Sequence, residues 1–264
     1  MEEKVWERIN YTRLTLDQTS TPVYIDRAEV ENFYAPLGLY LLKKSRERKR
    51  LMVVVSGPPG SGKTVFAMLL VAVINAEADH EEAVQIPLDG WHYPNEYLDT
   101  HTTRYADHDV LLRQIKGSPA TYDTAAAFSC LEKIRKGGQI SYPVYSRIQH
   151  DPIANGGMVE PFHKIVILEG NYWLLQDAPW TKFQPLFDVR IFLTAKAETL
   201  LDGLRQRQLR GGRSAEAIEQ QITNVDLPNI EFVLKNSARA DIVVHKADNS
   251  HIINVEYLNN INLG

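Results

Sequence analysis

The feature that most constrains the fold is a glycine-rich segment, GPPGSGKT at residues 57–64, which stands between two apolar stretches. Residues 51–55 before it form an apolar run without alternation, as expected of a strand buried on both faces of a parallel sheet. Residues 63–76 after it continue with the pattern of an apolar helix. The order strand, glycine-rich turn, helix predicts an α/β fold with this turn at one edge of the sheet.

The segment fits the pattern G-x-x-x-x-G-K-S/T, whose spacing has a chemical reason. Glycines allow backbone amides to point inward at a phosphate, and the following helix adds its N-terminal amides and the positive end of its dipole. We expect Lys63 to reach the β- and γ-phosphates and the Thr64 hydroxyl to bind Mg²⁺. The predicted cofactors are therefore ATP and Mg²⁺, bound by Gly57, Pro58, Pro59, Gly60, Ser61, Gly62, Lys63 and Thr64.

Strand and helix patterns alternate through the rest of the chain. Further strands are predicted at residues 83–88, 165–168, 189–193 and 241–244. Helices are predicted at residues 29–42, 123–136 and 214–236, and another follows the strand at 189–193 and runs to about residue 210. Residues 252–255 can add an antiparallel edge strand. This alternation predicts a three-layer P-loop NTPase fold: a mainly parallel five-stranded sheet with helices on both faces. We expect one nucleotide-binding domain at residues 51–264, preceded by an extension at residues 1–50 with one helix packed on the core, for which a homodimer contact is the other interpretation.

Composition limits the classes of function. The formal net charge of the 264-residue chain is −4 and its pI is about 6.1, so nucleic acid is not an expected partner. Its basic run, residues 43–50, is interpreted as a solvated helix end. The sequence has one cysteine, Cys130, and its longest apolar run is too short to cross a membrane. We expect a cytoplasmic protein without a membrane partner.

Two carboxylates follow predicted strands. Glu169 closes an apolar run and precedes glycine, a position where phosphate-loop proteins place an acid near Mg²⁺; the alternative is a surface glutamate that begins a loop. Asp89 follows the strand at residues 83–88, where it could accept the proton of an acceptor hydroxyl. The alternative for Asp89 is a turn residue, because Asp-Gly is a common turn pair.

Several segments together resemble one group of enzymes. They are PLDGWHYP at 87–94, KGSPATYD at 116–123, PVYSRIQHDP at 143–152, VILEGNYWLL at 166–175 and RQRQLRGGR at 205–213, in addition to the phosphate loop. In order and spacing they are similar to the uridine kinase, phosphoribulokinase and pantothenate kinase family of P-loop kinases. The resemblance covers residues 51–245 and extends to a bacterial branch that includes kinases associated with fructose import.

The resemblance implies a role for each matching position. It implies that Asp89 is the general base and that Glu169 lies near the metal and the acceptor. It places Tyr145, Arg147 and His150 in an acceptor-binding loop. It also implies an arginine-rich lid at about residues 203–215 that closes over the phosphates, with Arg205 and Arg210 catalytic, Arg207 binding the nucleotide and Arg213 as a further member.

The chain also departs from the family pattern around Asp89. Trp91 is bulky. His92 and Tyr93, which we expect to contact the acceptor, occupy positions where uridine kinases carry other side chains, so the acceptor pocket cannot be copied from those enzymes. Two stretches rich in Pro, His, Asp and Gly, residues 93–119 and 141–161, are expected to be irregular and functional. Within the first, residues 101–108 suggest an acceptor-binding loop with Arg104 rather than a metal site, since tight ligands are lacking.

These features together predict an ATP-dependent phosphotransferase that acts on a hydroxyl of a small metabolite. A sugar, a nucleoside and a pantothenate-like alcohol remain open as acceptors, and Asn229 or Lys246 could contact the adenine. The alternatives are a nucleotide-dependent switch or assembly ATPase, and a regulator with degenerate catalysis. Neither alternative requires Asp89.

Overall fold

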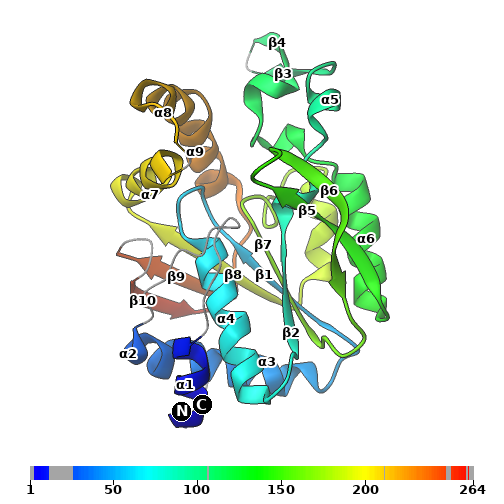
Figure 1. The fold of residues 1–264 in the computed structure, drawn as a ribbon, viewed down its shortest axis with the longest axis vertical. Helices are drawn as coiled ribbons and strands as arrows, with labels where there is room; N and C mark the ends of the chain where they lie inside the picture. Colours follow the sequence, from blue (N-terminus) through cyan, green and yellow to red (C-terminus); the bar gives the residue numbers. More distant parts are fainter. Residues whose placement is uncertain are drawn as a thin grey trace.

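The computed structural model describes residues 3–11, 26–105, 107–210, 212–247, 251–259 and 261. Its centre is a six-stranded sheet of order β10-β9-β8-β1-β7-β2 (Figure 1). Five strands are parallel and β10 pairs antiparallel with β9, which confirms the predicted sheet and its extra edge strand. The strands are β1 (Leu51–Ser56), β2 (Ala83–Pro87), β7 (Ile165–Gly170), β8 (Val189–Ala195), β9 (Ile242–Lys246) and β10 (Ile252–Tyr257).

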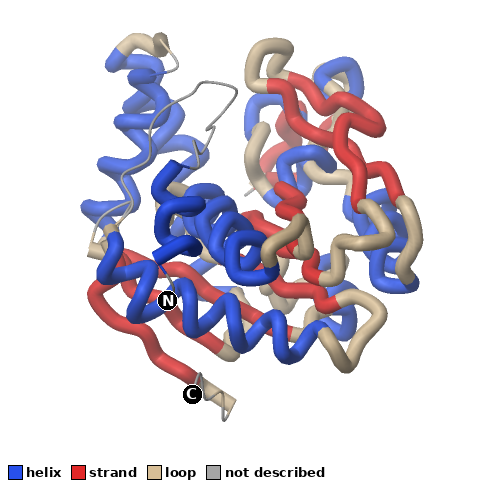
Figure 2. Tube along the Cα trace, turned by 60° about the horizontal axis from the view of Figure 1, so that its bottom comes forward, coloured by secondary structure: helices blue, strands red, loops and turns tan. Residues whose placement is uncertain are grey.

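Helices cover both faces of this sheet, as predicted. One face packs against the first helices of the chain and against the helix that follows the phosphate loop, and the other packs against a layer rich in aromatic side chains. In the view of Figure 2 the helices of the N-terminal part lie in front of the strands. The helices of the first layer are α1 (Glu3–Tyr11), α2 (Arg27–Glu29), the π-helix η1 (Val30–Tyr34), α3 (Ala35–Ser45) and α4 (Lys63–Ala78).

Helix ends follow the signals in the sequence. Asp123 caps α6 (Thr124–Lys136) by accepting a hydrogen bond from the backbone N–H of Ala126 at 2.9 Å, and Gly137 ends it. Ser214 caps α8 (Ala215–Gln221) in the same way. The predicted helix at residues 214–236 continues through a π-helical turn, η6 (Ile222–Asp226), into α9 (Leu227–Asn236). The remaining helices are α5 (Asn95–Leu98), α7 (Ala197–Arg210) and the 3-10 helices η2 (Leu88–Trp91), η3 (Leu112–Ile115), η4 (Pro119–Thr121) and η5 (Trp180–Leu186).

The expectation that residues 93–119 and 141–161 are irregular was wrong. Each contains a hairpin: β3 (Thr102–Tyr105) with β4 (His108–Leu111), and β5 (Ile140–Ser146) with β6 (Asp151–Val159). These strands could not be predicted from an apolar pattern, because both hairpins lie outside the central sheet and many of their side chains are polar and exposed to solvent. In Figure 1 they rise on one side of the molecule, and α7, α8 and α9 rise on the other.

The N-terminal part also differs from the expectation. Residues 3–11, which have no clear pattern, form α1, and Ile9 of this helix is fully buried in the same core as α3 and α4. A domain boundary at residue 50 stays a prediction. Within the described residues, no helix combines the length and the apolar character that a membrane span requires.

Candidate active site

The phosphate loop joins β1 to α4 in a conformation that requires its glycines. Gly57, Gly60 and Gly62 have φ values of 153°, 82° and 77°. A Cβ atom at Gly57 would lie 2.2 Å from the carbonyl oxygen of Leu193, and one at Gly60 would lie 2.2 Å from that of Leu200. The loop therefore passes close to β8 and α7 in a way that only glycine permits.

Lys63 begins α4 and is buried. Its Nζ donates hydrogen bonds to the Pro58 carbonyl at 2.8 Å and to Ser61 Oγ at 3.3 Å. Burial lowers its pKa to about 8, although the charge of Glu169 acts in the opposite direction. The ammonium group is thus held inside the loop, at the position where phosphate oxygens would replace the loop's own acceptors.

Thr64 and Glu169 meet across the end of the sheet. Thr64 Oγ1 donates a hydrogen bond to Glu169 Oε1 at 3.2 Å, because β7 lies beside β1 with Val55 paired to Glu169. Burial, and next to it the charge of Asp89, raises the pKa of Glu169 to about 7. A hydroxyl and a carboxylate are hard oxygen donors, so this pair fits Mg²⁺.

Most of the coordination of such an ion would come from phosphates and water, as is usual for Mg²⁺. Within the described part of the chain, no group of three or more His, Cys, Asp or Glu side chains could hold a metal ion.

Asp89 lies in η2, directly after β2. Its carboxylate accepts hydrogen bonds from Arg147 Nη2 at 2.8 Å and from Tyr122 Oη at 3.3 Å, and His92 Nε2 lies 4.0 Å away. Burial alone would raise the pKa of Asp89, but the charges of Arg147 and Arg207 and the hydrogen bond from Tyr122 oppose it, and the pKa lies below its ordinary value. Asp89 is therefore ionised near pH 7, and it lies near both Lys63 and Glu169, because its charge affects the pKa of each.

Gly90 allows β5 to approach Asp89. A Cβ atom at Gly90 would lie 2.0 Å from the carbonyl oxygen of Pro143, so only glycine permits this contact between η2 and β5. The contact sets Tyr145 and Arg147, from the end of β5 and the turn after it, beside the carboxylate.

Aromatic rings line the same place. The His92 ring stacks on Tyr122 with centroids 3.9 Å apart and meets Tyr145 edge-on at 5.6 Å. Burial lowers the pKa of His92 to about 4, against the opposing charge of Asp89, so its ring is neutral near pH 7. Lys116 Nζ and Arg147 Cζ lie 5.1 Å and 5.3 Å from the centroid of Tyr145. The site is thus a carboxylate surrounded by rings and cations.

Three predicted acceptor residues are placed differently. Tyr93 stacks on Tyr97, with centroids 4.3 Å apart. Arg104 is exposed on β3. The His150 side chain is exposed, and it is the carbonyl of this residue that accepts hydrogen bonds, from Lys116 and from Asn95.

The arginines of the candidate lid have different surroundings. Arg205 pairs with Glu219 at 2.8 Å and with Asp202 at 3.5 Å, so its guanidinium is held between α7 and α8. Arg207 lies close enough to Lys63 and Asp89 that its charge lowers the pKa of both. Arg213 donates a hydrogen bond to Gln208. The side chain of Arg210, together with Gly211, lies outside the described residues.

No role is predicted from the sequence for Lys116, Tyr122 or Asn95, although Lys116 and Tyr122 belong to the KGSPATYD segment on which the resemblance rests. Asn229, one expected adenine contact, is buried and donates a hydrogen bond to the Gly117 carbonyl at 3.5 Å, beside Lys116. Its contact with adenine stays a prediction. Lys246, the other, is buried at the end of β9.

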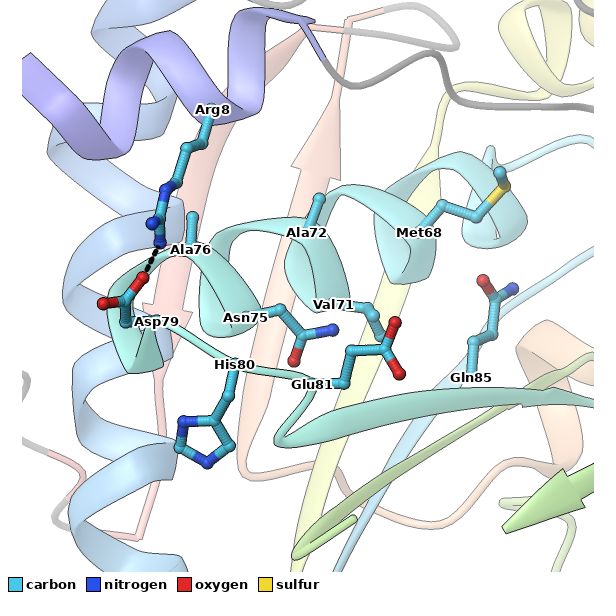
Figure 3. A pocket seen from close by; sticks show the side chains of 10 residues that line it. All are labelled: Arg8, Met68, Val71, Ala72, Asn75, Ala76, Asp79, His80, Glu81 and Gln85. Atoms are coloured by element: carbon cyan, nitrogen blue, oxygen red, sulfur yellow. Dashed lines mark ion pairs between the residues drawn. The ribbon is translucent and has the colours of Figure 1, made fainter. Parts of the chain in front are cut away.

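A cavity of about 550 Å³ lies elsewhere, along α4 (Figure 3). It is open, and none of the predicted site residues lines it. Its walls come from α1, α4, the segment between α4 and β2, and β2 itself. Arg8 of α1 forms an ion pair with Asp79, which directly follows α4.

Comparisons with known proteins agree with this geometry. The model of the phosphoribulokinase / uridine kinase family matches residues 52–252. The uncharacterized protein YggC of Escherichia coli is 30% identical over 237 residues, which cover 89% of this chain and 95% of YggC. A pantothenate kinase of Mycobacteroides abscessus is 28% identical over 272 residues, which cover 87% of this chain and 84% of that protein.

A solved structure is similar over most of the chain. It is described as a candidate fructose transport system kinase from Silicibacter sp. TM1040, with a TM-score of 0.71 and 28% identity, and the match covers 80% of this chain and 98% of that one. Together with the phosphate loop and the strand-end carboxylates, the family match shows that this chain belongs to the phosphoribulokinase / uridine kinase family of P-loop kinases.

Proposed function

We propose that this protein transfers the γ-phosphoryl group of ATP to a hydroxyl of a small metabolite, with Asp89 as the general base. The observation that carries the proposal is the position of Asp89 beside Lys63 and Glu169, at the edge of the sheet where the phosphate loop lies. Tyr122 and Arg147 hold this carboxylate ionised and oriented, and Tyr145 and His92 wall the space next to it. A switch or regulator has no use for such a base.

The reaction then follows from these positions. The acceptor hydroxyl gives its proton to the Asp89 carboxylate as its oxygen attacks the γ-phosphorus. The bond from the γ-phosphorus to the bridging oxygen breaks, and ADP leaves with that electron pair. Lys63 and Arg207 lie where they can stabilise the charge on the phosphoryl oxygens. Thr64 and Glu169 would hold Mg²⁺, which supplies further neutralisation of the phosphates.

The relatives support this class of reaction and offer candidate acceptors. Pantothenate and sugars come from the relatives' names, and nucleosides and sugar phosphates come from the family name. The decisive test is transfer of labelled γ-phosphate from ATP to a panel of these compounds, with the Asp89→Asn variant beside wild type.

We expect Asp89→Asn to bind ATP like wild type and to lose about 100-fold or more in transfer, the scale of general-base help. Equal transfer by the variant would remove Asp89 from the mechanism. ATP binding without transfer to any acceptor would favour the switch or regulator instead.

A further inference from the structure

Two cations near the candidate base share one uncharged acceptor. Lys116 Nζ donates a hydrogen bond to Asn95 Oδ1 at 2.7 Å, and Arg113 Nη1 donates to the same oxygen. Lys116 also donates to the carbonyl oxygen of His150 at 2.8 Å. Two positive groups that converge on an amide oxygen repel each other, and an anionic oxygen at that point would relieve the repulsion.

The neighbouring carboxylates do not take this position. Asp99 lies 3.6 Å from Nε of Arg113, which is not the nitrogen that donates to Asn95, and its side chain is half exposed. Asp151 accepts a hydrogen bond from the backbone N–H of Asn95 at 2.8 Å. Asp89 is bound to Arg147. Lys116 itself donates its hydrogen bonds to two uncharged oxygens, those of the Asn95 amide and the His150 carbonyl.

The cations lie on the acceptor side of the site. Lys116 and Arg147 both contact the ring of Tyr145, at 5.1 Å and 5.3 Å from its centroid, and Arg147 reaches Asp89. Burial and the charge of Arg113 lower the pKa of Lys116, and the charges of Asp151, Asp89 and Asp99 act in the opposite direction, so Asp89 is one of the carboxylates near this ammonium group. A small molecule with its hydroxyl at Asp89 would therefore extend past Tyr145 toward Lys116.

We propose that Lys116, together with Arg113 and Arg147, binds an anionic group of the acceptor, a phosphate monoester or a carboxylate, in place of the Asn95 amide oxygen. That this anion belongs to the acceptor rests on the function proposed above, whereas the anion site itself does not depend on that function. The substrate is then a hydroxyl compound with a negative charge at its far end, and neutral sugars and nucleosides are poor substrates. Three cations from two segments that meet only in the fold create this preference.

A binding experiment tests the anion site without any transfer. Inorganic phosphate is titrated calorimetrically into protein whose phosphate loop is already filled with Mg²⁺ and a non-hydrolysable ATP analogue. We expect Lys116→Met to weaken phosphate binding about tenfold or more, the scale of a lost charge-assisted hydrogen bond. The matched control is Lys182→Met. Lys182 lies on η5, over the rings of Phe128 and Phe183, so this variant should bind phosphate with unchanged affinity.

No phosphate binding by wild type, or equal binding by Lys116→Met and wild type, would overturn the anion site. The outcome is independent of whether the protein transfers phosphate.

A transfer experiment then identifies the kind of anion. Matched pairs of compounds are used: ribose with ribose 5-phosphate, and pantothenol with pantothenate. We expect the charged member of one pair to be the better substrate, and Lys116→Met to raise its KM by about tenfold or more with a smaller change in kcat. A neutral member preferred by wild type, or a kcat loss with KM unchanged, would contradict the inference. Transfer to none of the four would count against the proposed function, and the phosphate titration would still decide the anion site.

Discussion

Lys63 shows how one residue depends on its loop. Its ammonium group is buried and bound to the Pro58 carbonyl and to Ser61, both uncharged, in a position that triphosphate oxygens would share. Lys63→Ala should therefore weaken ATP binding by about tenfold or more and abolish transfer, because a buried charge-assisted contact is lost. Calorimetry with ATP and Mg²⁺ measures the first effect. Asp89→Asn serves as the control that keeps ATP affinity, and unchanged ATP binding by Lys63→Ala would contradict the phosphate-loop assignment.

His92 allows a prediction about pH. Its folded pKa of about 4 lies below the ordinary value of 6.5, so the unfolded chain binds more protons between these values. The stabilisation from neutral His92 is therefore complete above pH 6.5 and is lost as pH falls toward 4, by up to about 3 kcal/mol. His92→Phe keeps a ring against Tyr122 and should lose less stability over this range than wild type does, as measured by urea unfolding at each pH.

His80 is the matched control, because it is exposed and its pKa is raised by a hydrogen bond to Glu82. Its contribution is present below the unfolded pKa and is lost as pH rises, so His80→Gln should not reduce the acid-side loss. If wild type and His92→Phe lost the same unfolding free energy between pH 6.5 and pH 4, burial would not be what holds His92 neutral.

At the scale of elements, the contact between η2 and β5 decides whether the candidate base has partners. Gly90→Ala would place a methyl group 2.0 Å from the Pro143 carbonyl, and one of the two elements must move. We expect a loss of stability of about 1–3 kcal/mol and a transfer rate that falls more than ATP affinity does, because the shift separates Asp89 from Arg147. Thermal unfolding and transfer kinetics measure the two effects.

Gly38→Ala is the control for this change. A Cβ atom at Gly38 would meet its nearest neighbour, Val73, at an ordinary 3.4 Å, far from η2. A Gly90→Ala protein as active as wild type would mean that the hairpin does not position the base.

At the scale of the whole molecule, one buried guanidinium joins parts that are distant in sequence. Arg50 is 3% exposed and donates to the carbonyls of Ile134 and Gly138, at the end of α6, and of Glu160 and His163, before β7. Arg50→Met would remove all four hydrogen bonds, although the carbonyls of Ile134 and Glu160 would keep a backbone donor, and it should cost about 3 kcal/mol of unfolding free energy.

Arg48→Met is the matched control for Arg50. Arg48 is 43% exposed and pairs with Asp188 at 3.1 Å, so its loss should cost less than about 1 kcal/mol. Urea unfolding of both variants measures the difference, and equal losses would show that Arg50 does not join these segments.

The features of this protein that have a local cause could be predicted from its sequence. The parallel strands appear as unbroken apolar runs because both of their faces are buried, and Asp123 and Ser214 mark helix starts because a cap acts within three residues. The phosphate loop can be recognised in the sequence for the same reason, because its glycines, Lys63 and Thr64 all lie within the eight residues 57–64. Only their roles toward ATP and Mg²⁺ remain predictions.

Tertiary structure decided what depends on meetings between distant segments. The two hairpins have no apolar pattern of their own, since they pack outside the central sheet. Arg147 and Tyr122 reach Asp89 from 58 and 33 residues away, and Lys116 and Arg113 converge on Asn95, while Arg205 is held by Glu219. Charged groups and aromatic rings interact only over a few ångströms. The distance between two such side chains cannot be read from their spacing in the sequence, because it depends on how the sheet and its loops bring the segments together.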